Sequence, residues 1–389
     1  MDYRTYDRVY HFFLRGIVYP LIKKKLHFEG ESIPAGAGPK LILCNHNTDL
    51  DFLLIAGVCS EATDVVGTET VLRMNPVIRF AAKKLKPILH DKGSKGLGTI
   101  KQIVERIRDG RNVLLFPEGN RSFDGRTGEI SKSLGRIASM AGCTIVVYRL
   151  TGGYFTSPRW GRGIRKGRMA GKVTRILTPK DIGEMSAAQV QRSLEEGLAT
   201  DAYKEQEMEP VRFKGKAKAE YLETLLFQCP SCKKIAALKS KKDKVRCDCG
   251  FELIMDEYGF LVDQNGERHT VTKLFADQKE YLRELLNEAR SLQKPLWEDR
   301  VQMTQLGADH KVLSWENITL TVLPDQIRIG EKVFDYGQIE NIDIVQRNRL
   351  LIHVKKSVRH YEFIGEKTFN AVKYLLWHEK DLRGKEGDS

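Results

Sequence analysis

The residues in this sequence best suited to chemistry are a histidine and an aspartate five positions apart. They are His46 and Asp51, in the stretch from Asn45 that directly follows an apolar run. Imidazole has a pKa near neutrality, so His46 can act as a general base that takes the proton of an attacking hydroxyl. A carboxylate bonded to the other ring nitrogen would fix its tautomer and stabilise the imidazolium that forms. Asp49 competes with Asp51 for this role, although it is equally suited to cap a helix.

A second polar block, running from Phe116 to Ser122, also directly follows an apolar run. Its Arg121 can hold a phosphate through the planar guanidinium, and backbone N–H groups around Gly119 can face the same phosphate or an oxyanion. The two blocks therefore predict a general base next to an anion-binding site.

Together, Asn45-His46-Asn47-Thr48-Asp49-Leu50-Asp51 and Phe116-Pro117-Glu118-Gly119-Asn120-Arg121-Ser122 resemble the signatures of the glycerolipid acyltransferase family. That family includes 1-acyl-sn-glycerol-3-phosphate acyltransferase, and the resemblance covers residues 27–205. It implies that Asp51, rather than Asp49, orients His46. It also implies that the substrate contacts come from Asn45, Lys92, Glu118, Gly119, Arg121 and Ser122.

The activity that the resemblance implies is acyl transfer from a thioester, acyl-CoA or acyl carrier protein, to a lysophospholipid. The first expected acceptor is 1-acyl-sn-glycerol-3-phosphate, giving phosphatidic acid, with no cofactor needed for catalysis. The sequence departs from the family at three places. Asn120 stands where threonine is more frequent, Lys92 replaces an arginine, and residues 146–150 lack the family's Val-Pro-Val block. The last departure affects the substrate pocket rather than the chemistry.

Four of the seven cysteines form two close pairs, Cys229-Pro230-Ser231-Cys232 and Cys247-Asp248-Cys249. Two thiolate pairs joined by a hairpin-length segment can close a tetrahedral zinc site, and the module resembles a zinc ribbon. Because four ligands leave no open position, the zinc is expected to be structural. This cysteine usage favours a reducing compartment, so we expect a cytoplasmic protein.

The elements that position these residues alternate in type. Short β-like runs alternate with helical ones, which predicts an α/β domain whose β-sheet is covered by helices. The strands are expected at 41–44, 65–67, 87–90, 112–116, 144–148 and 172–177, and the helices at 51–59, 76–85, 96–108, 131–141 and 186–203. The expected domains are an amphipathic N-terminal helix (1–26), the acyltransferase domain (27–207), a zinc ribbon (219–262), a connecting helix (270–296) and an all-β domain with a terminal helix (305–389). The last weakly resembles a pleckstrin-homology fold.

The net charge of +13 favours anionic partners. No run of apolar residues is long enough to span a membrane. The predicted helix at 3–26 repeats Tyr6, Tyr10, Phe13, Ile17 and Leu21 on one face. It either packs on the next domain or lies in an anionic membrane surface. The second reading predicts a peripheral protein on the inner face of the cell membrane, and the basic loop around Trp160 is a further candidate contact.

Two other functions fit parts of the sequence. The lysines of the cysteine module suit a zinc-ribbon protein that binds nucleic acid, but the module lacks the aromatic residues that stack on bases. That reading also leaves the first two hundred residues unexplained. A lipid-binding protein with an inactive acyltransferase domain is disfavoured because His46, Asp51, Glu118 and Arg121 are all present.

Overall fold

The computed structural model describes residues 3–36, 38–68, 87–90, 97–307, 312–355, 360–366 and 369–379. The chain divides into two compact units. The first comprises Met1–Arg159 and Gly163–Gly215, and the second comprises Trp160–Arg162 and Lys216–Ser389. The predicted helix at 76–85 and the candidate residue Lys92 lie outside the described residues.

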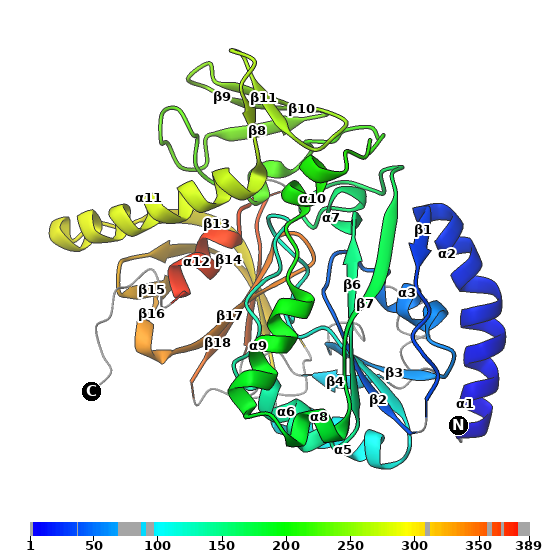
Figure 1. Ribbon diagram of the computed structural model, residues 1–389. Coiled ribbons are helices and arrows are strands. Elements are labelled where there is room, and N and C mark those ends of the chain that lie inside the picture. The colour runs from blue at the N-terminus through cyan, green and yellow to red at the C-terminus, as the bar shows by residue number, and fades with distance from the viewer. Residues whose placement is uncertain are drawn as a thin grey trace. The chain divides into compact units, whose positions relative to one another are not determined.

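A seven-stranded sheet forms the centre of the first unit (Figure 1). Its strands are β1 (Phe28–Gly30), β2 (Lys40–Cys44), β3 (Thr63–Thr68), β4 (Ile88–His90), β5 (Asn112–Leu115), β6 (Thr144–Thr151) and β7 (Met169–Leu177). The order is β1-β7-β6-β2-β5-β3-β4, and every pair is parallel except β6 with β7. All six predicted strands are present, and the α/β class is confirmed.

Helices cover both faces of this sheet because the central strands are apolar on both sides. In β2, Leu41 and Leu43 pack in one cluster with α5, α6 and α9, while Ile42 and Cys44 pack in another with α3. Figure 1 shows α3 on one side of β6 and β7, and α6, α8 and α9 on the other. The helices are α3 (Asp51–Val58), α5 (Leu97–Arg108), α6 (Leu134–Ala141), α7 (Gly153–Thr156), α8 (Pro179–Gly183), α9 (Ala187–Leu198) and α10 (Ala202–Met208).

One helix predicted at 186–203 is in fact two. The break falls between α9 and α10, where Asp201 adopts an extended backbone and its side chain accepts the N–H of Lys204. An aspartate that caps the following helix starts a new helix rather than continuing the old one. Hydrophobic spacing alone did not reveal this break. The buried residues Val190, Leu194, Leu198 and Ala202 keep a spacing of four across it, as in one continuous helix.

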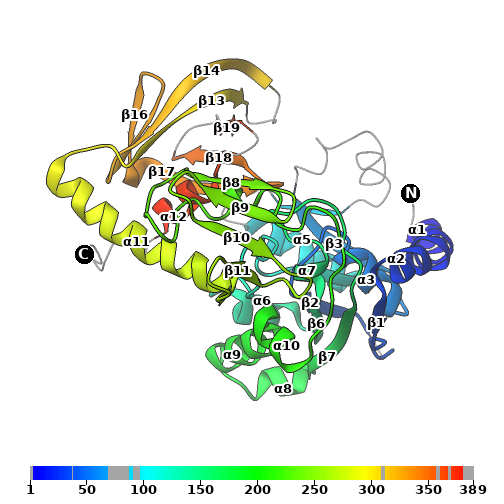
Figure 2. The ribbon, with the colours of Figure 1, turned by 90° about the horizontal axis from the view of Figure 1, so that it is seen from above.

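The predicted N-terminal helix is continuous from Tyr3 to Leu26, with a π-helical middle. It comprises α1 (Tyr3–Val9), η1 (Tyr10–Val18) and α2 (Tyr19–Leu26). Tyr6, Tyr10 and Leu14 pack on a cluster formed partly by α3, and Figure 2 shows α2 beside α3. The predicted single apolar face is therefore split, because Phe13, Ile17 and Leu21 are exposed. Among the described residues, no helix has the length and apolarity needed to cross a membrane.

The second unit holds a small sheet, a long helix and a larger sheet. The cysteine module forms β8 (Leu238–Lys241), β9 (Lys244–Cys247), β10 (Glu252–Met255), β11 (Leu261–Asp263) and β12 (Arg268–His269), after the short 3₁₀ helix η3 (Leu222–Thr224). Helix α11 (Val271–Leu292) follows. The Gln278 side chain of α11 accepts the N–H of Phe227 and donates to the carbonyl of Leu225, which fixes the helix to the base of the module.

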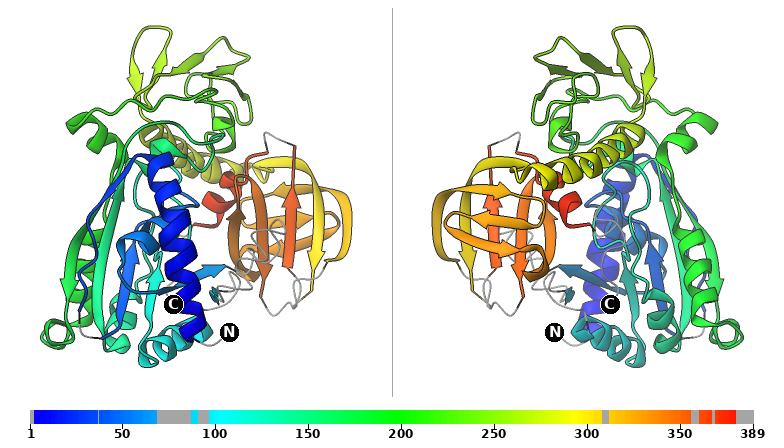
Figure 3. Two further views of the ribbon diagram at one scale, coloured as in Figure 1. Left: turned by 90° about the vertical axis from the view of Figure 1, so that its right-hand side faces the viewer. Right: turned by 90° about the vertical axis from the view of Figure 1, so that its left-hand side faces the viewer.

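The larger sheet has seven antiparallel strands in the order β16-β15-β14-β13-β19-β18-β17. They are β13 (Trp297–Leu306), β14 (Val312–Val322), β15 (Gln326–Ile329), β16 (Lys332–Asp335), β17 (Ile339–Val345), β18 (Arg349–Val354) and β19 (His360–Ile364), with η4 (Tyr336–Gln338) before β17 and α12 (Val372–His378) after β19. Figure 3 shows this sheet curved into a half-barrel. The predicted all-β region with a terminal helix is confirmed, whereas its pleckstrin-homology resemblance stays a prediction.

Candidate active site

The two chemical motifs meet at one edge of the first sheet. His46 lies just beyond β2, and Phe116 lies just beyond β5. Because β2 and β5 are parallel neighbours, with Leu43 opposite Leu115, their carboxyl ends open at the same edge. Ligand sites of α/β sheets form at this edge. The topology therefore brings together two blocks that are far apart in sequence.

Asp51 anchors the loop that carries His46. It is the first residue of α3, and its side chain is completely buried. Its Oδ2 accepts the N–H groups of Asn47 and Thr48 at 2.6 and 2.8 Å, and its Oδ1 accepts the Thr48 hydroxyl at 2.7 Å. These bonds fold the residues between strand and helix around one carboxylate, which fixes where His46 can lie.

His46 is paired with Asp51, not with Asp49. Its Nδ1 lies 2.9 Å from Asp51 Oδ2. A carboxylate can only accept, so Nδ1 carries the proton and Nε2 is left with its lone pair. The imidazole stacks on the Phe116 ring, with centroids 4.3 Å apart. Within the described residues, no protein group is hydrogen-bonded to Nε2, which makes it the atom able to take a proton from a substrate.

The second motif holds the backbone on both sides of His46. Glu118 accepts the N–H of His46 at 2.8 Å, and the N–H of Ser122 donates to the carbonyl of His46 at 2.9 Å. The other Glu118 oxygen accepts the N–H of Gly128 at 2.6 Å. The Glu118 carboxylate thus ties the histidine loop to the segment that follows its own motif.

Burial makes the Glu118 side chain a weaker acid than an ordinary glutamate. Loss of hydration raises its pKa to about 7, against the opposing effect of the two N–H groups that it accepts. The negative charge of Asp51 adds a smaller increase in the same direction. A carboxyl group with this pKa changes charge near neutrality, beside the proposed base.

Arg121 is already held by three acceptors. Its Nε donates to the carbonyl of Asn47 at 2.9 Å, and one Nη donates to the carbonyl of Ser157. The other Nη pairs with Asp49 at 3.0 Å. Asp49 is 80% exposed whereas Arg121 is only 12% exposed. The aspartate is thus the partner that an incoming anion can displace.

Three other predicted substrate contacts have backbone partners in the structure. The Asn45 amide donates to the carbonyl of Leu150 and accepts its N–H, which joins the ends of β2 and β6. The N–H of Gly119, at a positive φ of 66°, donates to the carbonyl of Phe116. The Ser122 hydroxyl donates to the carbonyl of Arg126. Their roles in substrate binding stay predictions, and no signal in the sequence indicated these supporting contacts.

Comparison with known proteins agrees with this geometry. Residues 25–150 match the family described as Acyltransferase. A curated relative is the 1-acyl-sn-glycerol-3-phosphate acyltransferase LPAT1, chloroplastic, of Arabidopsis thaliana, 26% identical over 167 residues, covering 41% of this chain and 46% of the relative. A second, BAT2, chloroplastic, of Brassica napus, is 27% identical over 167 residues, covering 41% and 47%. The match to the acyltransferase family thus covers residues 25–150 of this chain.

The chain spans about half the length of these curated relatives. A similar solved structure is that of the 1-acyl-sn-glycerophosphate (LPA) acyltransferase PlsC from Thermotoga maritima. It has a TM-score of 0.41 and 19% identity, and the match covers 51% of this chain and 82% of that one. The family match at residues 25–150 confirms the resemblance stated from the sequence at the level of the family.

The basic loop that follows α7 differs from the expected exposed rim of the acyltransferase domain. Trp160 and Arg165 are both 3% exposed. Arg159 donates to Asn120 Oδ1 at 3.1 Å and stacks over the Phe123 ring. Two of the side chains proposed to meet lipid headgroups are therefore buried.

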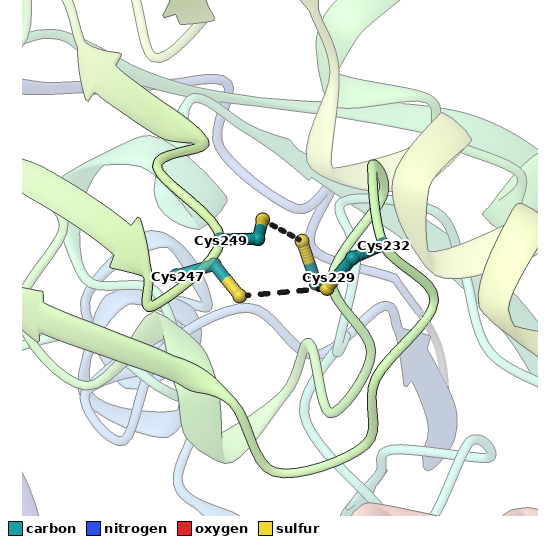
Figure 4. Close-up of side chains that lie close together, drawn as sticks. All are labelled: Cys229, Cys232, Cys247 and Cys249. Carbon is teal, nitrogen blue, oxygen red and sulfur yellow. Dashed lines mark hydrogen bonds between the residues drawn. The ribbon is translucent and has the colours of Figure 1, made fainter.

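The four clustered cysteines also come together as the sequence predicts. Cys229 and Cys232 lie on the loop before β8, whereas Cys247 ends β9 and Cys249 follows it. Their sulfur atoms converge in the second unit (Figure 4). Cys44, Cys59 and Cys143 lie in the core of the first unit.

Proposed function

We propose that the acyltransferase domain moves a fatty acyl chain from a thioester donor to a hydroxyl of a lysophospholipid. The observation that carries the proposal is the His46–Asp51 pair, which leaves Nε2 of His46 free at the edge of the sheet. The second motif holds the backbone of His46 through Glu118. The two plant relatives named as 1-acyl-sn-glycerol-3-phosphate acyltransferases favour that lysophospholipid as acceptor and phosphatidic acid as product. The donor is acyl-CoA or acyl carrier protein.

The proposed reaction passes through one tetrahedral intermediate. The acceptor hydroxyl oxygen attacks the thioester carbonyl while His46 Nε2 takes the hydroxyl proton. The intermediate then expels the thiolate of the donor, which takes the proton back from the imidazolium and leaves as the thiol. Asp51 stabilises the imidazolium between these two steps. No covalent acyl-enzyme is needed, because both substrates meet at one base.

We place the acceptor phosphate beside Arg121. In this proposal the phosphate displaces the exposed Asp49 from the guanidinium, while the bonds to the carbonyls of Asn47 and Ser157 hold the arginine in place. An arginine already fixed by two acceptors loses little side-chain freedom on binding. Lys92 remains a proposed second cation for the same phosphate.

We further propose that the N-terminal helix docks on an anionic membrane. One face packs on the domain through Tyr6 and Tyr10, while the opposite face exposes Phe12 (75%), Leu21 (64%) and Phe13 (52%). Lys23, Lys24 and Lys25 follow this face and can reach acidic headgroups. The acyl acceptor is itself a membrane lipid, and the free thiols favour the cytoplasmic side, so the inner face of the cell membrane is the proposed surface.

Nucleic-acid binding by the cysteine module is not favoured. Several of its basic side chains have acidic partners within the module. Lys239 pairs with Asp248, and both Lys244 and Arg246 pair with Glu252. These pairs reduce the free positive charge that phosphate binding requires.

The activity is tested by incubating the purified protein with a panel of lysolipids and with acyl-CoA or acyl carrier protein donors. We expect thiol release and a new diacyl lipid, with lysophosphatidic acid as the preferred acceptor. His46→Ala should abolish turnover, whereas the matched variant His269→Ala, in the second unit, should retain it. Turnover in His46→Ala above a few per cent of wild type would rule out this base.

Docking is tested by sedimentation with vesicles of phosphatidylglycerol and phosphatidylcholine. We expect the double variant Phe12→Glu/Leu21→Glu to remain in the supernatant while wild type sediments, and salt to weaken the wild-type binding. Met208→Glu is the matched control, since Met208 is 86% exposed on α10, away from the helix. Equal sedimentation of all three proteins would place the docking surface elsewhere.

A further inference from the structure

The four clustered cysteines have spacings that suit a metal rather than disulfides. Cys229 Sγ lies 3.8 Å from Cys249 Sγ, and Cys232 Sγ lies 3.7 Å from Cys247 Sγ. All four sulfur atoms lie within 4.8 Å of one another. A disulfide brings its sulfur atoms to ~2.05 Å. Around a zinc ion with Zn–S bonds of ~2.3 Å, the edge of a regular tetrahedron is ~3.8 Å.

Each cysteine pair lies on a tight turn of backbone that points two sulfur atoms the same way. In the first turn, Lys233 N–H donates to the carbonyl of Cys229, and Cys229 N–H donates to the carbonyl of Lys234. In the second, Gly250 N–H donates to the carbonyl of Cys247, and Cys247 N–H donates to the carbonyl of Phe251. Lys233 and Gly250 both have positive φ, which closes the turns. The two turns face each other across the sulfur cluster (Figure 4).

We propose that Cys229, Cys232, Cys247 and Cys249 bind one zinc ion as a structural tetrathiolate site. Each thiol gives up its proton to solvent as its sulfur forms a bond to Zn²⁺, so the site carries a net charge of −2. Four protein ligands fill the tetrahedron and leave no position for a substrate or water. The ion therefore fixes the fold of the module and takes no part in acyl transfer.

The ion would cross-link two turns at the end of the β8–β9 strand pair where Leu238 lies opposite Cys247. The first turn leads into β8, and the second lies between β9 and β10. An isolated antiparallel module of this size buries too little apolar surface to be stable alone, and a structural metal is a common remedy. The turn with Cys229 also adjoins Phe227, whose N–H is bound by Gln278 of α11. Zinc would thereby stabilise the start of the long helix.

Positive side chains beside the turns offset the charge of the proposed site. Lys233 and Lys234 directly follow the first pair. A cluster of cations next to a dianionic centre reduces its electrostatic cost. This arrangement gives the basic composition of the module a structural reason.

A second group of possible ligands, Asp263, Glu267 and His269, is a weaker candidate. Asp263 Oδ1 accepts the N–H groups of Asn265 and Glu267, and its Oδ2 lies 3.1 Å from His269 Nε2. These bonds account for the cluster as a stabilised turn between β11 and β12. The proposal is therefore confined to the cysteines.

The test measures metal in the purified full-length chain kept under reducing conditions. We expect one zinc ion per chain by mass spectrometry of the metal, released stoichiometrically when an organomercurial reagent blocks the thiols. Replacement by Co²⁺ should give the sulfur-to-cobalt charge-transfer and ligand-field absorption of tetrahedral thiolate coordination. These measurements do not depend on acyl transfer, so they test the zinc site independently of the proposed activity.

The variants Cys232→Ser and Cys249→Ser change the two exposed ligands, and Cys143→Ala removes a buried cysteine outside the cluster as a matched control. We expect Cys232→Ser and Cys249→Ser to lose most of the zinc and to unfold at a lower temperature than wild type. The control should keep both the zinc and the wild-type unfolding temperature. Wild-type protein with substoichiometric zinc and no cobalt–thiolate spectrum would overturn the proposal. So would full zinc retention in the double variant Cys232→Ser/Cys249→Ser.

Discussion

Replacing Asp51 by asparagine separates the charge of this side chain from its role in holding the loop. Oδ2 accepts from His46 Nδ1 and from two backbone N–H groups, so three donors converge on one oxygen. The amide oxygen of asparagine can take that position. Its NH₂ group then faces the Thr48 hydroxyl, which can accept in place of donating. Asp51→Asn should therefore preserve the loop and the tautomer of His46 while removing the negative charge.

The magnitude follows from the bonds that change. A hydrogen bond to a charged acceptor contributes ~1.5–3 kcal/mol and one to a neutral acceptor ~1 kcal/mol. The imidazolium exists only along the reaction path, so its lost stabilisation of about 0.5–2 kcal/mol lowers kcat by roughly 2- to 30-fold. In the folded state the weaker bonds to Asn47 and Thr48 are partly offset, because a buried charge no longer has to be desolvated. Stability should therefore change by less than about 2 kcal/mol.

The assay is steady-state acyl transfer with the donor and the acceptor varied in turn, together with thermal unfolding of the same preparations. Asp51→Asn should lose kcat with little change in either KM. Asp51→Ala is the contrasting variant: it leaves four donors without an acceptor, including the Thr48 hydroxyl, and should lower stability by roughly 3 kcal/mol or more. A kcat of Asp51→Asn equal to that of wild type would refute the proposed role of the Asp51 charge in stabilising the imidazolium. Equal losses of stability in both variants would show that the amide does not substitute for the carboxylate as a loop anchor.

Three further outcomes follow from the first unit. Burial raises the pKa of Glu118 from 4.5 to about 7, so the protonated side chain favours the folded state. This contribution to the free energy of unfolding is fully present below pH 4.5 and is lost as the pH rises through 7. In denaturant titrations, wild type should therefore lose about 3 kcal/mol relative to Glu118→Gln over this pH range. Gly135→Ala should destabilise by ~1–3 kcal/mol in the same titrations, because its Cβ would lie 2.4 Å from the carbonyl oxygen of Ala187, whereas Gly98→Ala on open helix surface should stabilise by up to ~1 kcal/mol. Arg121→Lys should raise the acceptor KM about tenfold, close to 1.4 kcal/mol, and leave the donor KM unchanged.

The placement of His46 and Asp51 was predictable because a strand–loop–helix junction constrains it. Residues five apart cannot share a face of one helix, so one of them had to lie in the loop, and His46 does. The support given by the second motif was not predictable in this way. Glu118 and Ser122 act through backbone atoms of His46, and side-chain types alone do not show which backbone they will meet.

In the second unit the cysteine spacing was informative and the strand pattern was less so. Two close pairs specify one ligand cluster almost independently of the surrounding fold. Strand β13 lies almost entirely before the predicted all-β domain (305–389), although it is the centre of the larger sheet. Its sequence begins with three consecutive charged residues, Glu298, Asp299 and Arg300, after Trp297, and only pairing with β14 and β19 reveals it as a strand. Local β-propensity predicts a strand least well where the neighbouring strands supply most of its stabilisation.

The structure of the N-terminal helix explains why its hydrophobic pattern predicted both packing on the domain and docking on a membrane. A regular α-helix would place Tyr6, Tyr10, Phe13 and Ile17 on a single stripe. From Tyr10 to Val18 the helix is instead π-helical. Its i→i+5 bonds put more residues into each turn, so the buried face follows a spacing of four to Leu14, and Phe13 and Ile17 rotate outward. Packing and membrane docking are therefore not competing fates of one face, because the wider turns divide the apolar residues into two faces that can serve both.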